Sequence, residues 1–202
     1  MLTGVTNLNK TLPYDAYKLL VIECSENGAT TGTEQLPERI EATKMNAQRM
    51  KRIDKTQQIH EKISTLVKNN DLKWKWVVLA ESWCGDGAQN IPIISKIAAL
   101  APHAIELQLI LRDEHPEIMD QYLTNGSRAI PKLICMDSET GKEIGTWGPR
   151  PIKIQQMVTD LKAANPTVSH DELVRNIHLW YAQDKGEALQ EELEQLLLKW
   201  IG

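Results

Sequence analysis

The sequence predicts an α/β fold. An apolar run rich in β-branched residues at 76–80 precedes a helical pattern over 91–100 and an alternating apolar run over 105–111. Strand, helix and strand in this order form a βαβ unit with parallel strands and a right-handed crossover. Two further apolar segments, 133–136 and 143–147, flank a glycine-containing turn and predict a β-hairpin in the same sheet.

Helical patterns occupy most of the remaining chain. Apolar residues recur at helical spacing over 13–26, 37–68 (with a break near 54–57), 152–164, 169–183 and 189–200. We expect the helix over 152–164 to cover the sheet. The chain therefore divides into an N-terminal helical extension (1–71), an α/β domain (72–165) and a C-terminal helical pair (166–202), packed as one compact unit.

Composition limits the classes of function. The chain has 202 residues and a formal net charge of −4, which gives no general argument for binding nucleic acid or an anionic membrane. It lacks an apolar run long enough to span a bilayer, and its N-terminus does not resemble a signal peptide. Three scattered cysteines, Cys24, Cys84 and Cys135, form neither a disulfide framework nor a zinc motif. We expect a cytoplasmic protein that binds no metal, membrane or nucleic acid.

Cys84 is the candidate catalytic residue. It lies just after the predicted strand over 76–80, at the first turn of a helix, where unpaired backbone N–H groups and the helix dipole favour a thiolate. Asp86 acts in the opposite direction, because a nearby carboxylate disfavours a second negative charge. The sequence leaves the net effect on the thiol open.

Two segments carry a resemblance to a known family. Trp83, Cys84 and Gly85 open a helix after an apolar strand, and Pro131 follows Cys84 by 47 residues, immediately before another apolar strand. In this respect the chain resembles the thioredoxin superfamily, and more narrowly an uncharacterised bacterial group with a Trp-Cys-Gly-Asp motif and helical extensions. The resemblance implies a three-layer sandwich, with a mixed sheet and helices on both faces. It also implies that Pro131 is cis and that Pro131 and Ile130 lie beside the sulfur.

The chain departs from thioredoxin at two positions. Gly87 replaces the second cysteine of the Cys-x-x-Cys motif, and Val78 replaces the buried acid that lies six residues before the nucleophile. A dithiol cycle completed within this chain is therefore not expected. Single-thiol glutaredoxins share an iron–sulfur cluster through a similar motif, but the carboxylate of Asp86 disfavours an anionic cluster, so we predict no cofactor.

Other residues have candidate roles around the sulfur. Gly85 and Asp86 would present backbone donors, while Ile130 and Pro131 would hold a substrate chain as an added strand. Arg112 and Arg128 could hold a thiolate or an anionic substrate. Alternatively, Arg112 simply pairs with the adjacent Asp113 or Glu114.

Three functions remain open at this point. In the first, the Cys84 thiolate attacks a protein or low-molecular-weight disulfide, and an external thiol resolves the adduct. In the second, the chain is a redox-inactive binding or scaffold protein. In the third, Cys84 reacts with peroxide, assisted by Arg112 or Arg128. The apolar stripe of the last helix is expected to pack on its own domain, and the alternative is that it joins two copies of the chain.

Overall fold

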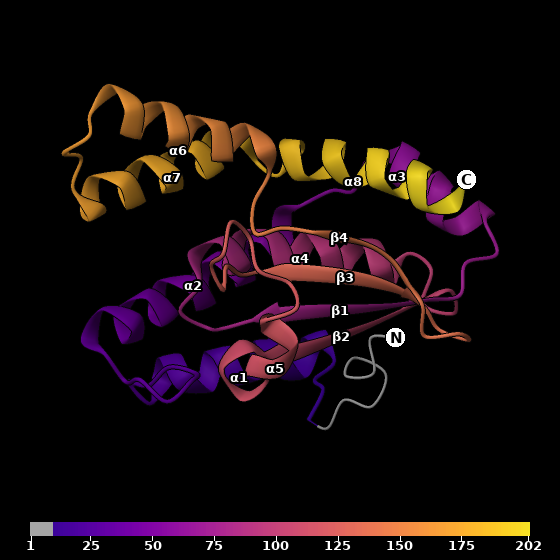
Figure 1. Cartoon of the computed structure of the whole chain (residues 1–202). Coiled ribbons are helices and arrows are strands. Elements are labelled where there is room, and N and C mark those ends of the chain that lie inside the picture. The colour runs from indigo at the N-terminus through magenta and orange to yellow at the C-terminus, as the bar shows by residue number, and fades with distance from the viewer. Residues whose placement is uncertain (1–9) are drawn as a thin grey trace.

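The central feature of the computed structural model, which describes residues 10–202, is a four-stranded mixed sheet with the order β2-β1-β3-β4 (Figure 1). The first nine residues of the predicted 1–71 extension lie outside the described residues. The strands are β1 (Trp74–Ala80), β2 (Ile105–Leu111), β3 (Lys132–Asp137) and β4 (Glu143–Trp147). β1 pairs with β2 in parallel and with β3 antiparallel, and β3 pairs antiparallel with β4. The predicted α/β fold is confirmed.

Helices account for most of the remaining described residues. They are α1 (Tyr14–Glu26), α2 (Pro37–Thr56), α3 (Glu61–Asn69), α4 (Gly85–Ala99), α5 (Pro116–Met119), α6 (Ile152–Ala164), α7 (His170–Asp184) and α8 (Glu187–Ile201), with a 3₁₀ turn at Arg112–Glu114. α4 is the crossover of the βαβ unit. The pattern over 37–68 divides into α2 and α3, with its break at 57–60 rather than near 54–57.

The two faces of the sheet bury two different apolar clusters. Trp76, Val78 and Ala80 of β1 join the larger cluster, to which α3, α4 and α8 contribute. Val77 and Leu79, which alternate with them along the strand, join the smaller cluster with Ile118 and Met119. The continuous apolar run of β1 is thus explained by burial on both faces.

α8, not α6, supplies the C-terminal cover of the sheet, so the expectation for 152–164 was wrong. The buried residues of α6, Ile154 and Val158, pack with Ile177 and Tyr181 of α7. α8 instead contributes apolar residues to the larger cluster. Its Trp200 ring lies edge-on to the rings of Trp74 and Trp76, with distances between ring centroids of 6.1 and 6.5 Å. The short apolar stripe of α6 therefore packs on α7, and the two helices lie side by side (Figure 1).

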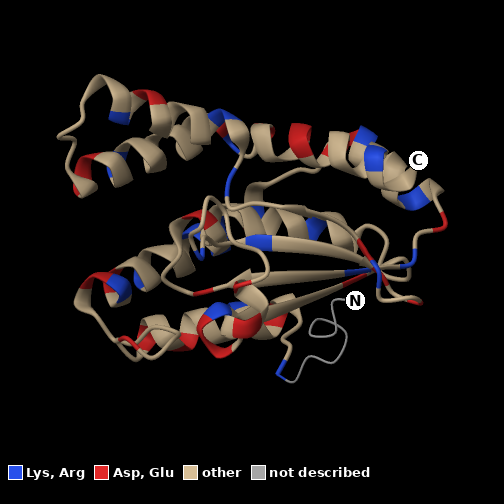
Figure 2. Ribbon diagram, in the orientation of Figure 1, with Lys and Arg blue, Asp and Glu red and all other residues tan. Residues whose placement is uncertain are grey.

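The charged residues are mixed along the helices. Figure 2 shows both acidic and basic residues on most of them. No helix within residues 10–202 combines the length and the apolar character needed to cross a membrane.

Candidate functional site

Cys84 is the N-cap residue of α4. Its backbone is extended, with φ −78° and ψ 112°, and its sulfur accepts a hydrogen bond from the Gly87 N–H at 3.3 Å. Gly87 thus places a backbone donor, and no second sulfur, one turn into the helix. The thiol itself donates to the carbonyl oxygen of Ile130 at 3.2 Å.

The segment facing the sulfur ends in a cis peptide bond. The Ile130–Pro131 bond is cis, and β3 begins at the next residue. Gly148 lies directly against this segment, because a Cβ atom on Gly148 would lie 2.2 Å from the Pro131 carbonyl oxygen. Its φ of +115° also favours glycine, and the Gly148–Pro149 bond that follows is cis as well. Two proline-containing segments therefore meet beside Cys84.

Burial keeps the Cys84 thiol protonated. The residue is 8% exposed, and its burial, followed by the charge of Asp86, raises the pKa of the thiol to about 12. The Gly87 N–H and the Arg150 guanidinium act in the opposite direction but do not compensate. The helix N-terminus favours a thiolate, as the sequence suggests, but desolvation is the larger effect here.

Asp86 is the centre of a buried polar cluster formed with the C-terminal helices. Its carboxylate accepts a hydrogen bond from Arg150 and another from the Tyr181 hydroxyl, at 2.7 Å for Tyr181. Asn90 of α4 donates in turn to the Tyr181 hydroxyl at 2.9 Å. Burial raises the pKa of Asp86, and Arg150 and Tyr181 limit that rise. The cluster ties α7 and the segment before α6 to the first turns of α4.

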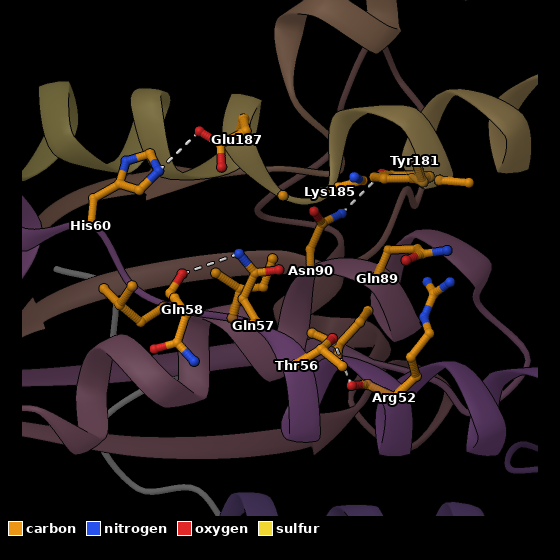
Figure 3. Close-up of a pocket in the computed structure, with 15 residues that line it drawn as sticks. Arg52, Thr56, Gln57, Gln58, His60, Gln89, Asn90, Tyr181, Lys185 and Glu187 are labelled. Atoms are coloured by element: carbon orange, nitrogen blue, oxygen red, sulfur yellow. Dashed lines mark hydrogen bonds and ion pairs between the residues drawn. The ribbon is translucent and has the colours of Figure 1, made fainter.

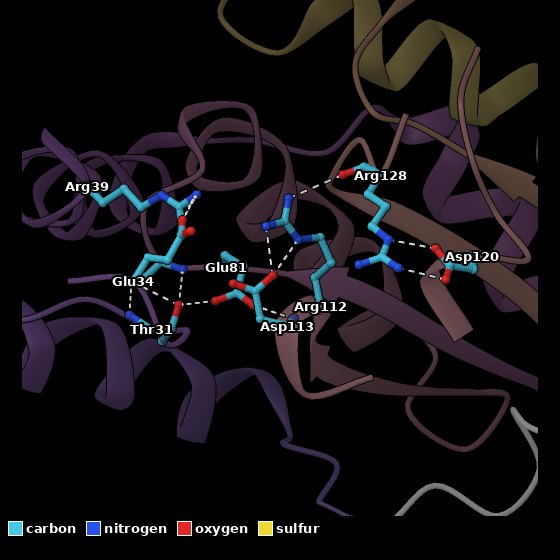
Figure 4. A network of polar contacts seen from close by, with 9 residues as sticks. Thr31, Glu34, Arg39, Glu81, Arg112, Asp113, Asp120 and Arg128 are labelled. Carbon is cyan, nitrogen blue, oxygen red and sulfur yellow. Dashed lines mark hydrogen bonds and ion pairs between the residues drawn. The ribbon is translucent and has the colours of Figure 1, made fainter. Parts of the chain in front are cut away.

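Two guanidinium groups lie against the ring of Trp83. Arg39 of α2 lies 4.5 Å from its ring centroid and Arg112 lies 4.8 Å from it, distances typical of cation–π contacts. Arg112 also forms an ion pair with Asp113 at 2.7 Å. Pairing with a neighbouring carboxylate is the alternative role that the sequence left open for Arg112. Arg112 further donates to the backbone oxygen of Arg128 at 3.3 Å (Figure 4).

Arg128 lies close to the site but has a partner of its own. Its guanidinium binds both carboxylate oxygens of Asp120, at 2.6 and 2.7 Å (Figure 4). Neither Arg128 nor Arg112 donates a hydrogen bond to the Cys84 sulfur. Their predicted role as thiolate contacts stays a prediction.

A buried carboxylate lies three residues before Cys84. Glu81 accepts hydrogen bonds from the Thr31 hydroxyl and, at 2.9 Å, from the backbone N–H of Asp113 (Figure 4). Burial raises the pKa of Glu81. The neighbouring Ser82 is hydrogen-bonded to Thr30 and Thr43, so this polar cluster joins α2 and the loop before it to the end of β1.

A groove of about 860 Å³ opens onto Cys84, and we call it the Cys84 groove. The α/β domain and both helical extensions line it. Besides Cys84, the predicted site residues Trp83, Gly85, Asp86, Arg112, Arg128 and Ile130 contribute to its walls. The structure thus brings together segments around positions 84, 112 and 130 that are far apart in the sequence.

Several residues of the site were not identified from the sequence. Arg49, Arg150 and His178 line the groove, and Tyr181 contacts Asp86 beneath it. One signal was available for Arg150, since it lies between two prolines in 149–151, a segment that cannot continue a strand or a helix. Nothing in the sequence pairs α7 with the first turn of α4.

A second, smaller cavity of about 460 Å³ is lined in part by Tyr181 (Figure 3). Its lining is rich in amide and basic side chains from α2, the α2–α3 connection, α4 and the α7–α8 turn, among them Arg52, Gln57, Gln89, Asn90 and Lys185. No cysteine lines it. Across residues 10–202, histidine, cysteine and carboxylate side chains do not gather in a group that could hold a metal ion.

Comparisons with known proteins agree with the architecture. A family model described as thioredoxin matches residues 33–162. A crystal structure of a protein of unknown function from Pseudomonas aeruginosa is similar, with 18% identity and a TM-score of 0.54 over 87% of this chain and 95% of that one. An HIV epitope scaffold is also similar, with 18% identity and a TM-score of 0.51 over 87% and 96% of the two chains. At this identity both structures inform on the fold alone. No curated protein matches.

Proposed function

This chain belongs to the thioredoxin family, and we propose that it exchanges thiols and disulfides through a single sulfur, that of Cys84. The observation that supports this most directly is the position of the sulfur. The sulfur belongs to the N-cap residue of α4 and lies 3.2 Å from the carbonyl oxygen of Ile130, the residue before the cis-proline Pro131. Cys84 also lines an open groove. The Trp-Cys-Gly-Asp motif over 83–86, followed by Gly87 in place of a second cysteine, agrees with chemistry at one sulfur.

The proposed reaction proceeds in two exchange steps. The Cys84 thiolate attacks one sulfur of a disulfide, a new S–S bond forms, and the other half leaves as a thiolate that takes up a proton. Because Gly87 supplies no second thiol, an external thiol then attacks the mixed disulfide and releases the Cys84 thiolate, which is reprotonated. The net result is exchange of partners between a disulfide and a thiol, with no net oxidation of the protein.

The environment of Cys84 makes the first step slow in the free protein. With a pKa of about 12, roughly one molecule in 10⁵ carries the thiolate at pH 7. Once ionised, a thiolate of high basicity is a strong nucleophile, which compensates for only part of this loss. Changes that relieve the burial of Cys84 or neutralise Asp86 should therefore accelerate exchange.

A second candidate function is binding without thiol chemistry. The observation that favours it is the same burial and raised pKa of Cys84, which are usual for a structural thiol. In that case the Cys84 groove would hold a ligand through its arginine side chains.

Location and assembly are further proposals. The three free cysteines suit a reducing compartment such as the cytoplasm. A substrate would be a protein or low-molecular-weight disulfide. Two copies could associate through the C-terminal helices, where Leu179 and Leu198 are exposed.

The decisive experiment measures Cys84 alone. In a variant with Cys24 and Cys135 replaced by serine, the protein is incubated with a low-molecular-weight disulfide between pH 7 and 10, and the adduct is weighed by mass spectrometry. Exchange predicts a mixed disulfide on Cys84 that forms faster as pH rises and disappears on addition of an external thiol. No adduct at pH 10, under conditions where the unfolded chain reacts, supports the binding function instead. Treatment with peroxide, followed by a probe for sulfenic acid, tests the peroxide reaction.

A further inference from the structure

The Cys84 groove contains five arginines, and four of them have carboxylate partners. The pairs are Arg39 with Glu34, Arg112 with Asp113, Arg128 with Asp120 and Arg150 with Asp86. Arg49 of α2 is the exception. Among residues 10–202 it makes no ion pair, and its one side-chain hydrogen bond goes to the amide oxygen of Asn46, at 2.8 Å.

The guanidinium of Arg49 lies against the residue that follows the candidate nucleophile. A Cβ atom on Gly85 would lie 3.8 Å from Arg49 Nη1 and 3.0 Å from His178 Cε1. The absence of a side chain at Gly85 thus leaves the Arg49 and His178 side chains close to the first turn of α4. A charged group at this position is within a few ångströms of the backbone that carries Cys84.

Of the two side chains beside Gly85, Arg49 is charged at neutral pH and His178 is not. Burial, and secondly the charge of Arg49, lowers the pKa of His178 to about 4, so its ring is neutral at pH 7. Burial also lowers the pKa of Arg49, but a guanidinium stays protonated in proteins. The Nδ1 atom of His178 is buried and has no hydrogen-bond partner. A half-buried cation without a counter-charge is costly, and an anionic ligand would offset that cost.

The rest of the groove is consistent with a small anion. Lys162 of α6 also lines it and makes no ion pair with the described residues. Three carboxylates lie in the lining too. Asp86 is paired with Arg150, and the other two residues, Glu38 and Asp171, are exposed. The volume of about 860 Å³ is in the range of small-molecule sites.

We propose that Arg49, with His178 beside it, binds a carboxylate of the disulfide substrate, so that the preferred substrates are low-molecular-weight disulfides with a carboxylate close to the sulfur. This inference rests on the proposed exchange function of Cys84. It identifies the substrate class, and it assigns recognition to residues of the two helical extensions, one from α2 and one from α7. Arg49 contacts the bound substrate and takes no part in the transfer of sulfur.

The test compares two disulfides of similar size. Dithiodipropionate carries carboxylates, hydroxyethyl disulfide is neutral, and the rate of adduct formation on Cys84 is measured for each at about 20 mM ionic strength, where charge effects are poorly screened. We expect Arg49→Gln to lower the ratio of the anionic to the neutral rate about tenfold, as for the loss of one charged hydrogen bond.

The matched control is Lys51→Gln. Lys51 lies on the same helix, is exposed and lines neither cavity, so its replacement removes the same net charge and should leave the ratio within about twofold. Equal effects of the two substitutions on the ratio would overturn the proposal. If Arg49→Gln does not fold, as judged by circular dichroism, Arg49→Lys takes its place. That variant keeps the charge and should keep most of the preference, and its failure to do so when folded would count against a charge-based site.

A binding measurement separates this inference from the exchange function. In a Cys84→Ser background, titration of dithiodipropionate by calorimetry should detect binding that Arg49→Gln weakens at least about fivefold. Binding of this kind without any Cys84 adduct in the parent protein would refute exchange and leave the anion site standing. Adduct formation together with binding that ignores Arg49 would refute the anion site and leave exchange standing.

Discussion

Replacing Asp86 with asparagine should make Cys84 react faster at neutral pH. The charge of Asp86 is the second cause of the raised pKa of Cys84, after burial. The asparagine side chain would be uncharged but similar in shape, and its oxygen could still accept from the Tyr181 hydroxyl that now donates to Asp86 at 2.7 Å. Arg150 would lose its carboxylate partner and would be free to stabilise a thiolate nearby.

The size of the effect follows from Coulomb's law. Two unit charges about 6 Å apart interact by about 3 kcal/mol at an effective dielectric constant of about 20, which corresponds to about a hundredfold change in an ionisation constant. Arg150 already offsets part of the Asp86 charge, so we expect an increase in alkylation rate at pH 7.5 of about ten- to a hundredfold. Burial is unchanged, so the pKa of Cys84 should still lie above that of an exposed thiol.

The assay is the rate of iodoacetamide alkylation between pH 6 and 11, with Cys24 and Cys135 replaced by serine. Asp171→Asn is the matched control, because Asp171 also lines the Cys84 groove but is exposed, and its charge is screened by solvent. We expect the control to change the rate less than about twofold. A rate in Asp86→Asn that equals or falls below the parent rate, in a protein with an unchanged melting curve, would refute the assignment of Asp86 as a cause of the raised pKa.

Three further outcomes are expected. The folded state holds the Cys84 proton more tightly than the unfolded chain, so the contribution of this thiol to stability is fully present below pH ~8.5. As pH rises toward the folded pKa of about 12, the free energy of unfolding should fall by up to ~1.4 kcal/mol per pH unit. Urea titrations of the parent and of Cys84→Ser, both with Cys135 replaced, should diverge with this slope. Tyr181→Phe removes a donor to Asp86 and should lower the free energy of unfolding by about 1–3 kcal/mol, measured in urea, whereas a change below about 0.3 kcal/mol would mean that the hydrogen bond is not formed. Gly145→Ala would place a Cβ atom 2.2 Å from Nε1 of Trp200, so we expect the free energy of unfolding to fall by about 1–3 kcal/mol. Tryptophan fluorescence should also change, because Trp200 would move away from Trp74 and Trp76. An unchanged spectrum would argue against the packing of α8 on the sheet.

The fold could be predicted from the sequence where it depends on neighbouring residues. The apolar run of β1, the helical pattern of α4 and the alternation in β2 lie within 40 residues, and the pattern of each element predicts it without reference to the others. The position of α6 could not be predicted in this way. An amphipathic stripe shows that a helix buries one face, but not whether a sheet or another helix covers that face.

The candidate site, like the fold, could be predicted from the sequence only where it depends on neighbouring residues. Cys84 and Asp86 belong to one local motif, so their opposing effects on the thiol could be anticipated, and only the balance between burial and helix dipole stayed open. The partners of Asp86 are 64 and 95 residues away in the sequence. The general rule that a buried carboxylate needs a partner predicts that such groups exist, but it does not identify Arg150 and Tyr181.

The pKa of Cys84 therefore depends in part on residues that lie far from it in the sequence. Asp86 raises the pKa of the thiol, and Arg150 and Tyr181, which precede α6 and lie on α7, hold Asp86 in its buried position. Movement of α7 away from α4 would break the hydrogen bond from Tyr181 to Asp86 and would admit water to the Cys84 groove, which α7 lines through Val174, Ile177 and His178. Both consequences lower the pKa of Cys84, because a hydrated thiolate is less costly and a hydrated carboxylate repels it less. We therefore expect the pKa of Cys84 to fall toward that of an exposed thiol, about 8.5, in any state in which α7 moves away from α4.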